Sequence, residues 1–286
     1  MSLISLITLT HNKLAVTRRC LPSLLRSSAR NWELIVLENG STDGTLEWLK
    51  AFQREAESAG VRMTILPQAK NIGCSTGRNV AAAAASGDQL VFLDNDVAVR
   101  SLNWMEGLGR VIEEDSTAAI VCPKLVYPFP PYAIQCAGGA VTPAGRVIFM
   151  GRGEANGESR FNQRCEVQWA ISACWMMRAD AFRESGGFDE AFNPVQFEDT
   201  DLCYRIRSRG YRVLYEPAVE MYHYESTTTA GTAGLPNTAL VVRHGLLFRN
   251  RWLSMIEKEN GPAESEAAWR KIAIPPLESI PEPPVV

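Results

Sequence analysis

Short apolar runs alternate with amphipathic segments through the first hundred positions. Four apolar runs predict strands, at Leu3–Leu9, Leu34–Leu37, Met63–Leu66 and Leu90–Leu93. The segments between them carry apolar residues at helical spacing, at Lys13–Ser28, Gly44–Glu57 and Ser75–Ser86. Pro22 lies inside the first of these, so that helix is expected to be kinked or divided there. Strands that alternate with helices predict an α/β fold, with a mostly parallel central sheet and helices on both faces.

The pattern changes after about residue 120. Glycine and proline become frequent between Ile120 and Trp169, which predicts hairpins and loops. Further elements are then expected: helices at Asp180–Ser185, from Asp199 to Gly210 and at Thr238–Ile256, and a strand at Tyr211–Tyr215. The segment Ser226–Gly234 has no core-forming pattern and is expected to be a mobile loop. Residues 263–286 hold five prolines and are expected to form an extended tail.

Polar clusters follow three of the four predicted strands. They are Thr10-His11-Asn12, Glu38-Asn39-Gly40-Ser41 and Asp94-Asn95-Asp96. Ligands of parallel α/β sheets bind beyond the carboxyl ends of the strands. The three clusters therefore predict a single cleft.

The sharpest local signal is the pair of acids Asp94 and Asp96 after the apolar run Val91–Leu93. Side chains two positions apart on a strand point to the same side, so both carboxylates can reach one cation. Hard oxygen ligands suit Mn²⁺ or Mg²⁺, which keep open positions for water and substrate phosphates. The alternative interpretation is a solvated turn after a strand.

Five ordered motifs resemble the inverting glycosyltransferases of family 2, which have the GT-A fold, over roughly residues 3–225. The motifs are Leu6–Asn12 with its T-x-N turn, Glu33–Thr45, Asn71-Ile72-Gly73 with Gly77-Arg78-Asn79, Val91–Val97, and Gly186–Glu190 followed by Glu198-Asp199-x-Asp201-Leu202. Two positions depart from the usual pattern: His11 stands in place of tyrosine, and Glu38 in place of the first aspartate.

The resemblance implies transfer of a sugar from a nucleotide diphosphate sugar to an acceptor hydroxyl, in surface polysaccharide or glycoconjugate synthesis. Residues 1–225 would be the catalytic domain, with a nucleotide-binding half (1–118) and an acceptor-binding half (119–225). Residues 226–262 would supply a lid loop and a C-terminal helix. The expected nucleotide-sugar contacts are Thr8, Thr10, Asn12, Glu38, Asn39, Asn71, Gly73, Arg78, Asn79, Asp94 and Asn95.

Several of these residues have a structural alternative. A carboxylate at Glu38 can accept the imide N–H of uracil or thymine, which favours a UDP- or dTDP-sugar, whereas Asp43 can either bind the nucleotide or cap the following helix. Arg78 near a helix N-terminus can bind a diphosphate or tie the helix to a neighbouring acid.

The acidic cluster Glu198-Asp199-Thr200-Asp201 opens a predicted helix, where acids are favoured by the helix dipole alone. Clustered acids also raise one another's pKa, which suits a general base. The resemblance places that base at Asp199, with Glu198 and Asp201 expected at the acceptor. Trp175 is expected as the wall under an acceptor sugar or as a core residue.

His223 follows the strand Tyr211–Tyr215 and the turn at Pro217. A histidine at this place in the family can be a third metal ligand beside Asp94 and Asp96. The alternative is a stacked or capping histidine.

The composition of the chain bears on its partners and on the compartment in which it is expected. The 286 residues are 46% apolar and 21% charged with a net charge of −3, so no overall basic field favours nucleic acid. Seven scattered cysteines without a C-x-x-C pair fit reduced thiols in the cytoplasm. With no run long enough for a transmembrane segment, any membrane contact is expected to be peripheral, at the inner face. The partners expected are the donor and a carbohydrate or lipid-linked acceptor.

The sequence disfavours three other functions. A phosphatase of the haloacid dehalogenase type also carries D-x-D after a strand, but here the acids follow the fourth predicted strand rather than the first. A non-catalytic nucleotide-sugar-binding module is disfavoured by the retained acids Asp94, Asp96 and Asp199. A dinucleotide-dependent oxidoreductase is disfavoured because no G-x-G-x-x-G follows the first strand.

Overall fold

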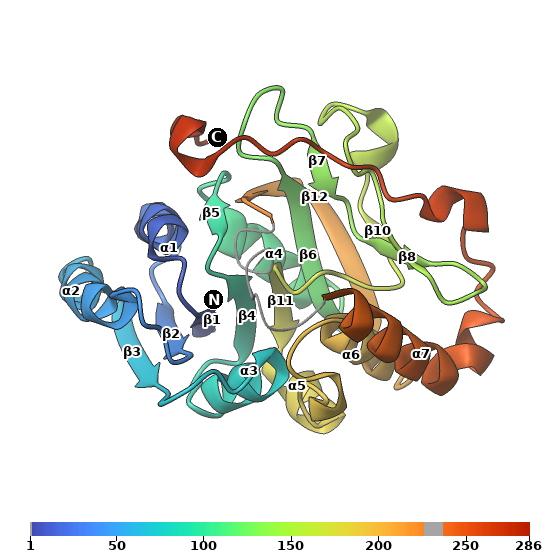
Figure 1. Cartoon of the computed structure of the whole chain (residues 1–286), viewed down its shortest axis with the longest axis horizontal. Helices are drawn as coiled ribbons and strands as arrows, with labels where there is room; N and C mark the ends of the chain where they lie inside the picture. The colour runs from blue at the N-terminus through green and yellow to red at the C-terminus, as the bar shows by residue number, and fades with distance from the viewer. Residues whose placement is uncertain (1, 226–236) are drawn as a thin grey trace.

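The computed structural model describes residues 2–225 and 237–286, and these form one central sheet flanked by helices (Figure 1). The strands follow the order β10-β12-β6-β11-β4-β1-β2-β3, with β5 paired to β12 and β7 paired to β6. A separate hairpin consists of β8 and β9. The predicted lid, Ser226–Gly234, lies outside the described residues.

The elements have the following bounds. The strands are β1 Ile4–Thr10, β2 Trp32–Glu38, β3 Arg62–Pro67, β4 Gln89–Asp94, β5 Val97–Val99, β6 Ala118–Val126, β7 Ile134–Cys136, β8 Gly139–Val141, β9 Val147–Phe149, β10 Cys165–Glu166, β11 Cys174–Arg178 and β12 Arg212–His223. The α-helices are α1 Leu14–Cys20, α2 Thr45–Ser58, α3 Cys74–Ala83, α4 Trp104–Glu114, α5 Ala179–Ser185, α6 Glu198–Arg207 and α7 Asn237–Ile256. Short 3-10 helices are η1 Leu21–Arg26, η2 Ser159–Phe161, η3 Glu190–Phe192, η4 Glu264–Ala267 and η5 Leu277–Ser279.

The four predicted N-terminal strands are confirmed, and β1 pairs in parallel with both β2 and β4. Thr10 lies opposite Glu38, and Leu9 lies opposite Asp94. The polar clusters after β1, β2 and β4 therefore lie at the same edge of the sheet. As expected, the first helix is divided near Pro22, where α1 passes into η1.

Two apolar layers cover the faces of the sheet. One layer packs η1, α2 and α4 against one face, and the other packs α3, α5, α6 and α7 against the opposite face. Gly77 lets α3 approach closely, because a Cβ atom there would lie 2.7 Å from Leu9 Cδ2. The α3 residues thereby reach the cleft edge of β4.

The second half of the sheet differs from the sequence prediction. The segment expected to hold hairpins and loops contains β6, a strand whose nine residues are all buried. Helix α4 and strand β11 were not predicted, and β11 runs antiparallel between β4 and β6. Strand β12 does not stop at Tyr215 but continues past Pro217 to His223, with a register shift between Glu216 and Glu220. The shift accommodates the proline, which cannot donate a ladder hydrogen bond.

The C-terminal tail crosses the molecule from α7 back to α1 (Figure 1). The Arg19 guanidinium donates to the carbonyl oxygens of Leu277 and Ile280, and the Tyr222 hydroxyl donates to Pro284 O at 2.7 Å. Ile280 is buried beside α1. None of the helices in the described ranges is both long and apolar enough to cross a membrane.

Candidate active site

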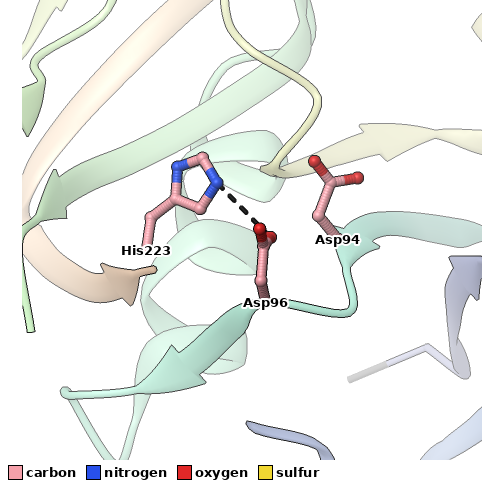
Figure 2. A group of neighbouring side chains, drawn as sticks. All are labelled: Asp94, Asp96 and His223. Carbon is pink, nitrogen blue, oxygen red and sulfur yellow. Dashed lines mark ion pairs between the residues drawn. The ribbon is translucent and has the colours of Figure 1, made fainter. Parts of the chain in front are cut away.

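Asp94, Asp96 and His223 converge at the edge of the sheet where β4 ends (Figure 2). One ligand atom from each residue lies within 4.8 Å of the other two. His223 Nε2 is 3.4 Å from Asp96 Oδ1. Asp96 and His223 are buried, whereas the Asp94 side chain is 38% exposed. The group is thus open on the side of Asp94.

Strand pairing explains why residues more than a hundred positions apart meet here. Asp94 ends β4, Asp96 follows one turn residue later, and β5 begins at Val97. Strand β5 pairs antiparallel with the end of β12, so that Val97 lies opposite His223. The backbone N–H of Tyr224 donates to Asp96 O at 2.9 Å and closes the arrangement.

The charges of the group act on one another. Burial raises the pKa of Asp94, and Asp96 adds to this effect while Arg78 opposes it. Burial acts to lower the pKa of His223, but the carboxylates of Asp96 and Asp94 outweigh it and raise that pKa above its ordinary value. The negative charge of the group therefore rests on the two carboxylates, which favour a positively charged neighbour.

The donor set fits a divalent cation. Two carboxylates and one imidazole supply oxygen and nitrogen ligands of the kinds that Mn²⁺ accepts and, for the oxygens, that Mg²⁺ prefers. Three protein ligands would leave coordination positions for phosphate oxygens and water. The group could therefore hold a metal ion.

Arg78 connects this group to the acidic cluster of α6. Its Nη2 lies 2.8 Å from Asp94 Oδ1, and its Nη1 lies 3.0 Å from Glu198 Oε1. The guanidinium also lies over the ring of Phe188, 5.3 Å from its centroid. Of the two interpretations of Arg78, the structure thus shows the tie to neighbouring acids.

Asp199 is the acid of the α6 cluster that keeps solvent access. It is partly exposed, whereas Glu198 and Asp201 are buried. Its Oδ2 accepts the Ser172 N–H at 3.3 Å, and its Oδ1 accepts the Thr200 N–H at 2.7 Å. Burial raises the pKa of Asp199 and, with the charge of Asp199, raises the pKa of Glu198 to about 7. An oriented carboxylate with a raised pKa is suited to accept a proton.

The loops after β1 and β2 are tied together by their own side chains. Asn12 Oδ1 accepts the Thr42 N–H, and Glu38 Oε1 accepts the Ser41 N–H at 2.6 Å. Asp43 accepts N–H bonds from Leu14 and Thr45, so it acts as a cap, one of its two expected roles.

A second set of contacts joins the β2 loop to the start of α3. Asn39 donates to Asn71 Oδ1 and accepts the Ile72 N–H, and Asn71 Oδ1 accepts the Gly73 N–H. Asn95 donates to Thr17 Oγ1 at 2.7 Å and so ties the turn between the two aspartates to α1. The residues expected at the nucleotide thus lie on loops fixed to one another.

Some residues that the sequence analysis expects at the site have little or no exposed surface. Thr8 and Thr10 are fully buried in β1, and Glu38 is 2% exposed. Trp175 is fully buried and stacks on Phe188 at 6.2 Å between centroids, which corresponds to the core position, one of its two expected roles.

Asp201 and Asn79 also have structural partners. Asp201 is fully buried and is held by Arg205, Arg251 and Trp252, so it cannot receive an acceptor. The Asn79 amide pairs with the backbone N–H and carbonyl of Phe188, which fixes the glycine-rich loop before α6.

The sequence prediction also missed residues that support the site. Gln135, on β7, contacts His223 Nδ1 at 3.4 Å, and Ser172 contacts Asp199. His244, on α7, contacts the carbonyl oxygens of Val195 and Gln196, just before α6. Nothing in the local sequence pattern marks these residues, since their roles come from long-range contacts.

The chain was compared with known families and proteins. Residues 5–186 match the model of Glycosyl transferase family 2. An uncharacterised protein of Sinorhizobium fredii is 30% identical over 87% of this chain and 27% of its own length. The N-acetylglucosaminyl-diphospho-decaprenol L-rhamnosyltransferase of Mycobacterium tuberculosis is 26% identical over 88% of this chain and 83% of its own length. An O-antigen biosynthesis protein of Myxococcus xanthus is 31% identical over 54% of this chain and 12% of its own length.

The chain thus spans well under half the length of some of these relatives. Solved structures resemble it in fold at low identity. GalNAc-T7, crystallised with UDP, GalNAc and Mn²⁺, superposes with a TM-score of 0.71 and 16% identity over 91% of this chain and 50% of its own. TarS of S. aureus, residues 1–349 with UDP-GlcNAc, gives a TM-score of 0.62 and 18% identity over 90% of this chain and 71% of its own. By its family match and its GT-A fold, the chain belongs to glycosyl transferase family 2.

Proposed function

We propose that this chain is a metal-dependent, inverting glycosyltransferase that transfers a sugar from a nucleotide diphosphate sugar to an acceptor hydroxyl. The observation that carries the proposal is the continuous polar group from His223 through Asp96 and Asp94 to Arg78, Glu198 and Asp199. This group supports the proposal because Arg78 contacts both Asp94, of the three possible metal ligands, and Glu198, the neighbour of Asp199.

Each part of this group has a task in the proposed reaction. A divalent cation held by Asp94, Asp96 and His223 would offset the charge that develops on the departing nucleoside diphosphate. Asp199 would accept the proton of the acceptor hydroxyl as its oxygen attacks the anomeric carbon. One such displacement inverts the anomeric centre. The buried ion pair of Arg78 with Glu198 would hold the two parts in a fixed relation.

The donor proposal rests on Glu38, whose carboxylate stands at the end of β2. One oxygen accepts the Ser41 N–H, and a carboxylate at this place matches the imide of uracil or thymine. We therefore favour UDP or dTDP as the nucleotide, with residues 1–118 holding it and residues 119–225 facing the acceptor. Structural neighbours bind UDP-GlcNAc in one case and GDP-Man with Mn²⁺ in another, so a GDP-sugar belongs in the test.

The acceptor proposal rests on the relatives. The matched mycobacterial rhamnosyltransferase is named for a lipid-linked diphosphate sugar, and other relatives are named for O-antigen and succinoglycan biosynthesis. A carbohydrate or lipid-linked acceptor at the cytoplasmic face of a membrane is the corresponding proposal for this chain.

The test is metal-dependent turnover of a panel of UDP-, dTDP- and GDP-sugars with water as acceptor, followed by product NMR once an acceptor is found. Asp96→Ala should abolish turnover, and EDTA should do the same to the unmodified protein. Asp88→Ala is the matched control, because Asp88 is an exposed acid just before the opposite end of β4. Full activity in EDTA would refute the metal mechanism, and a product with the donor's anomeric configuration would refute inversion.

A further inference from the structure

The His223 ring lies between two buried polar side chains. Its Nε2 is 3.4 Å from Asp96 Oδ1, and its Nδ1 is 3.4 Å from Gln135 Oε1. Gln135 is fully buried, and His223 is 5% exposed. Both separations are at the long end for hydrogen bonds, so a small shift of the ring toward either partner strengthens that contact.

Gln135 reaches His223 through an irregularity in the sheet. Strand β7 pairs antiparallel with β6, with Cys136 opposite Leu125 and Ile134 opposite Val126. The register therefore skips Gln135, which is the extra residue of a bulge. Bulges redirect a side chain and occur often beside active sites. The bulge accounts for an amide that contacts the candidate metal site from a neighbouring strand.

The two ring nitrogens have separate tasks in a metal-ligating histidine. The nitrogen that binds the cation needs a free lone pair, so the proton of the neutral ring must be on the other nitrogen. A hydrogen-bond acceptor beside that other nitrogen fixes both the proton and the ring orientation. Gln135 Oε1 occupies this place at Nδ1, which leaves Nε2 on the side of Asp96.

We propose that Gln135 is the positioning residue for His223: it accepts a hydrogen bond from Nδ1–H and so holds Nε2 toward the cation position. The inference rests on the proposed metal-dependent function. It adds a residue from β7, which neither the sequence motifs nor the metal-ligand geometry by itself assigns.

In the competing arrangement, the side-chain amide of Gln135 is flipped, so that its nitrogen and oxygen exchange places. Gln135 Nε2, which is buried and has no hydrogen-bond partner among the described residues, would then donate to Nδ1. The neutral ring would carry its proton on Nε2 and donate it to Asp96, and that tautomer has no lone pair for a cation. The two arrangements predict opposite effects of changing the amide to an acceptor-only group.

The first experiment measures Mn²⁺ affinity by electron paramagnetic resonance, with Mn²⁺ alone and with saturating UDP or GDP. Gln135→Leu removes the acceptor at similar volume and should weaken Mn²⁺ binding about 10–100-fold. Gln135→Glu keeps the acceptor and should bind within a few-fold of the unmodified protein or more tightly. His223→Ala gives the loss of Mn²⁺ affinity that results when the histidine ligand itself is removed. Gln53→Leu is the control, since Gln53 lies on α2 and its side chain donates to Met63 O on β3, not to any residue of the candidate metal site.

The second experiment needs no metal. Long-range ¹H–¹⁵N NMR distinguishes imidazole tautomers, and the chain has only three histidines. The His223 signals are assigned by their loss in His223→Ala. At a pH above the raised pKa of His223, we expect more of the Nδ1–H tautomer in the unmodified protein and in Gln135→Glu than in Gln135→Leu, where only Asp96 is left to draw the proton, toward Nε2. If thermal melting shows that Gln135→Leu is not folded, the spectra of the unmodified protein and of Gln135→Glu decide.

The outcomes distinguish a failure of the proposed role of Gln135 from a failure of the proposed metal-dependent function. Mn²⁺ binding that His223→Ala weakens but Gln135→Leu leaves unchanged would overturn the role of Gln135 alone. A tautomer ratio that is the same in the unmodified protein, Gln135→Glu and Gln135→Leu would do the same. No Mn²⁺ binding by the unmodified protein, with or without nucleotide, would overturn the metal-dependent function and the inference with it.

Discussion

Arg78 and Glu198 form a buried ion pair, with 3.0 Å between Nη1 and Oε1 and each side chain only 5% exposed. The pair joins α3 to the first turn of α6, 120 positions further along the chain. Because the same guanidinium contacts Asp94, the pair connects the candidate metal site to the candidate base. A contact of this kind has consequences for stability, for pH dependence and for ligand binding.

Breaking the pair should be strongly destabilising. Arg78→Met leaves Glu198 buried without its partner, which typically costs about 3–5 kcal/mol. The double variant Arg78→Met with Glu198→Gln should recover part of that loss, because no buried charge is left unpaired. Urea denaturation measures both. Arg26→Met is the control, since its pair with Glu282 is exposed and should contribute less than about 1 kcal/mol. Equal losses of unfolding free energy in Arg78→Met and Arg26→Met would contradict the expectation that the buried ion pair contributes more than the exposed one.

Catalysis should fail on the acid side of the pH profile. Asp199 must be ionised to accept a proton, and burial raises its pKa and that of Glu198, the latter to about 7. Turnover should therefore fall on the acid side at a higher pH than the ordinary pKa of an aspartate would give. Asp199→Asn should lose about 10²–10⁴-fold in rate. Glu198→Gln removes a neighbouring negative charge, so its acid limb should move to lower pH. An unshifted limb in a kcat/KM profile would rule out the coupling.

The raised pKa of Glu198 also makes the free energy of unfolding depend on pH. The native pKa of Glu198 is about 7 and its unperturbed value is 4.5, so the native state binds the extra proton between these values. Its contribution to stability is therefore greatest below pH 4.5 and is lost as the pH rises to 7. Glu198→Gln should gain stability relative to the unmodified protein across this window, as measured by urea midpoints. A difference that is independent of pH would show that the carboxyl does not titrate there.

Nucleotide affinity should depend on Glu38. Glu38→Gln can keep the bond from the Ser41 N–H but places an amide beside the base, so UDP binding should weaken by about 1–3 kcal/mol. Asp43→Asn is the matched control, because Asp43 accepts N–H bonds at the ends of two helices. It should cost about 1 kcal/mol of stability and leave UDP affinity unchanged. Calorimetry that finds equal UDP affinity in Glu38→Gln would assign Glu38 a structural role.

The docked tail should contribute to stability. Ile280 is 4% exposed and packs in a cluster with Val16, Tyr222 and Tyr224. Ile280→Ala should cost about 2 kcal/mol. Ile274→Ala, at a position 37% exposed, should cost less than about 0.5 kcal/mol. Thermal melting compares the two, and limited proteolysis should cut the tail faster in Ile280→Ala. Equal effects of both variants would mean that the tail is not anchored through Ile280.

The sequence by itself determined the N-terminal half of the sheet and the edge that carries the site. Period-2 and period-3.6 patterns are local, so β1, β2, β3 and β4 and the helices between them follow from residues close in the chain. Parallel strands joined by helices place their carboxyl ends together, and this brings the clusters at Thr10, Glu38 and Asp94 to one edge.

The tertiary structure decided which of the candidate residues face the cleft. Trp175, Asp201 and Thr8 have residue types suited to a binding site, yet each is fully buried by segments distant in sequence. Strand β6 contains Pro123 and Lys124, and β11 is a five-residue segment of Cys, Trp, Met and Arg, so neither has the uninterrupted aliphatic run that predicts β2. Burial depends on what packs against a residue, and local periodicity does not encode that.

The pairing of His223 with Gln135 shows the same limit most clearly. Their 88-residue separation is bridged by the β5–β12 and β6–β7 pairings and by a bulge that skips one position. A shift of one residue in strand register moves every side chain to the opposite face. The sequence therefore indicated that a histidine near position 223 could meet the two aspartates, and only the register of the folded sheet decided which amide stands behind it.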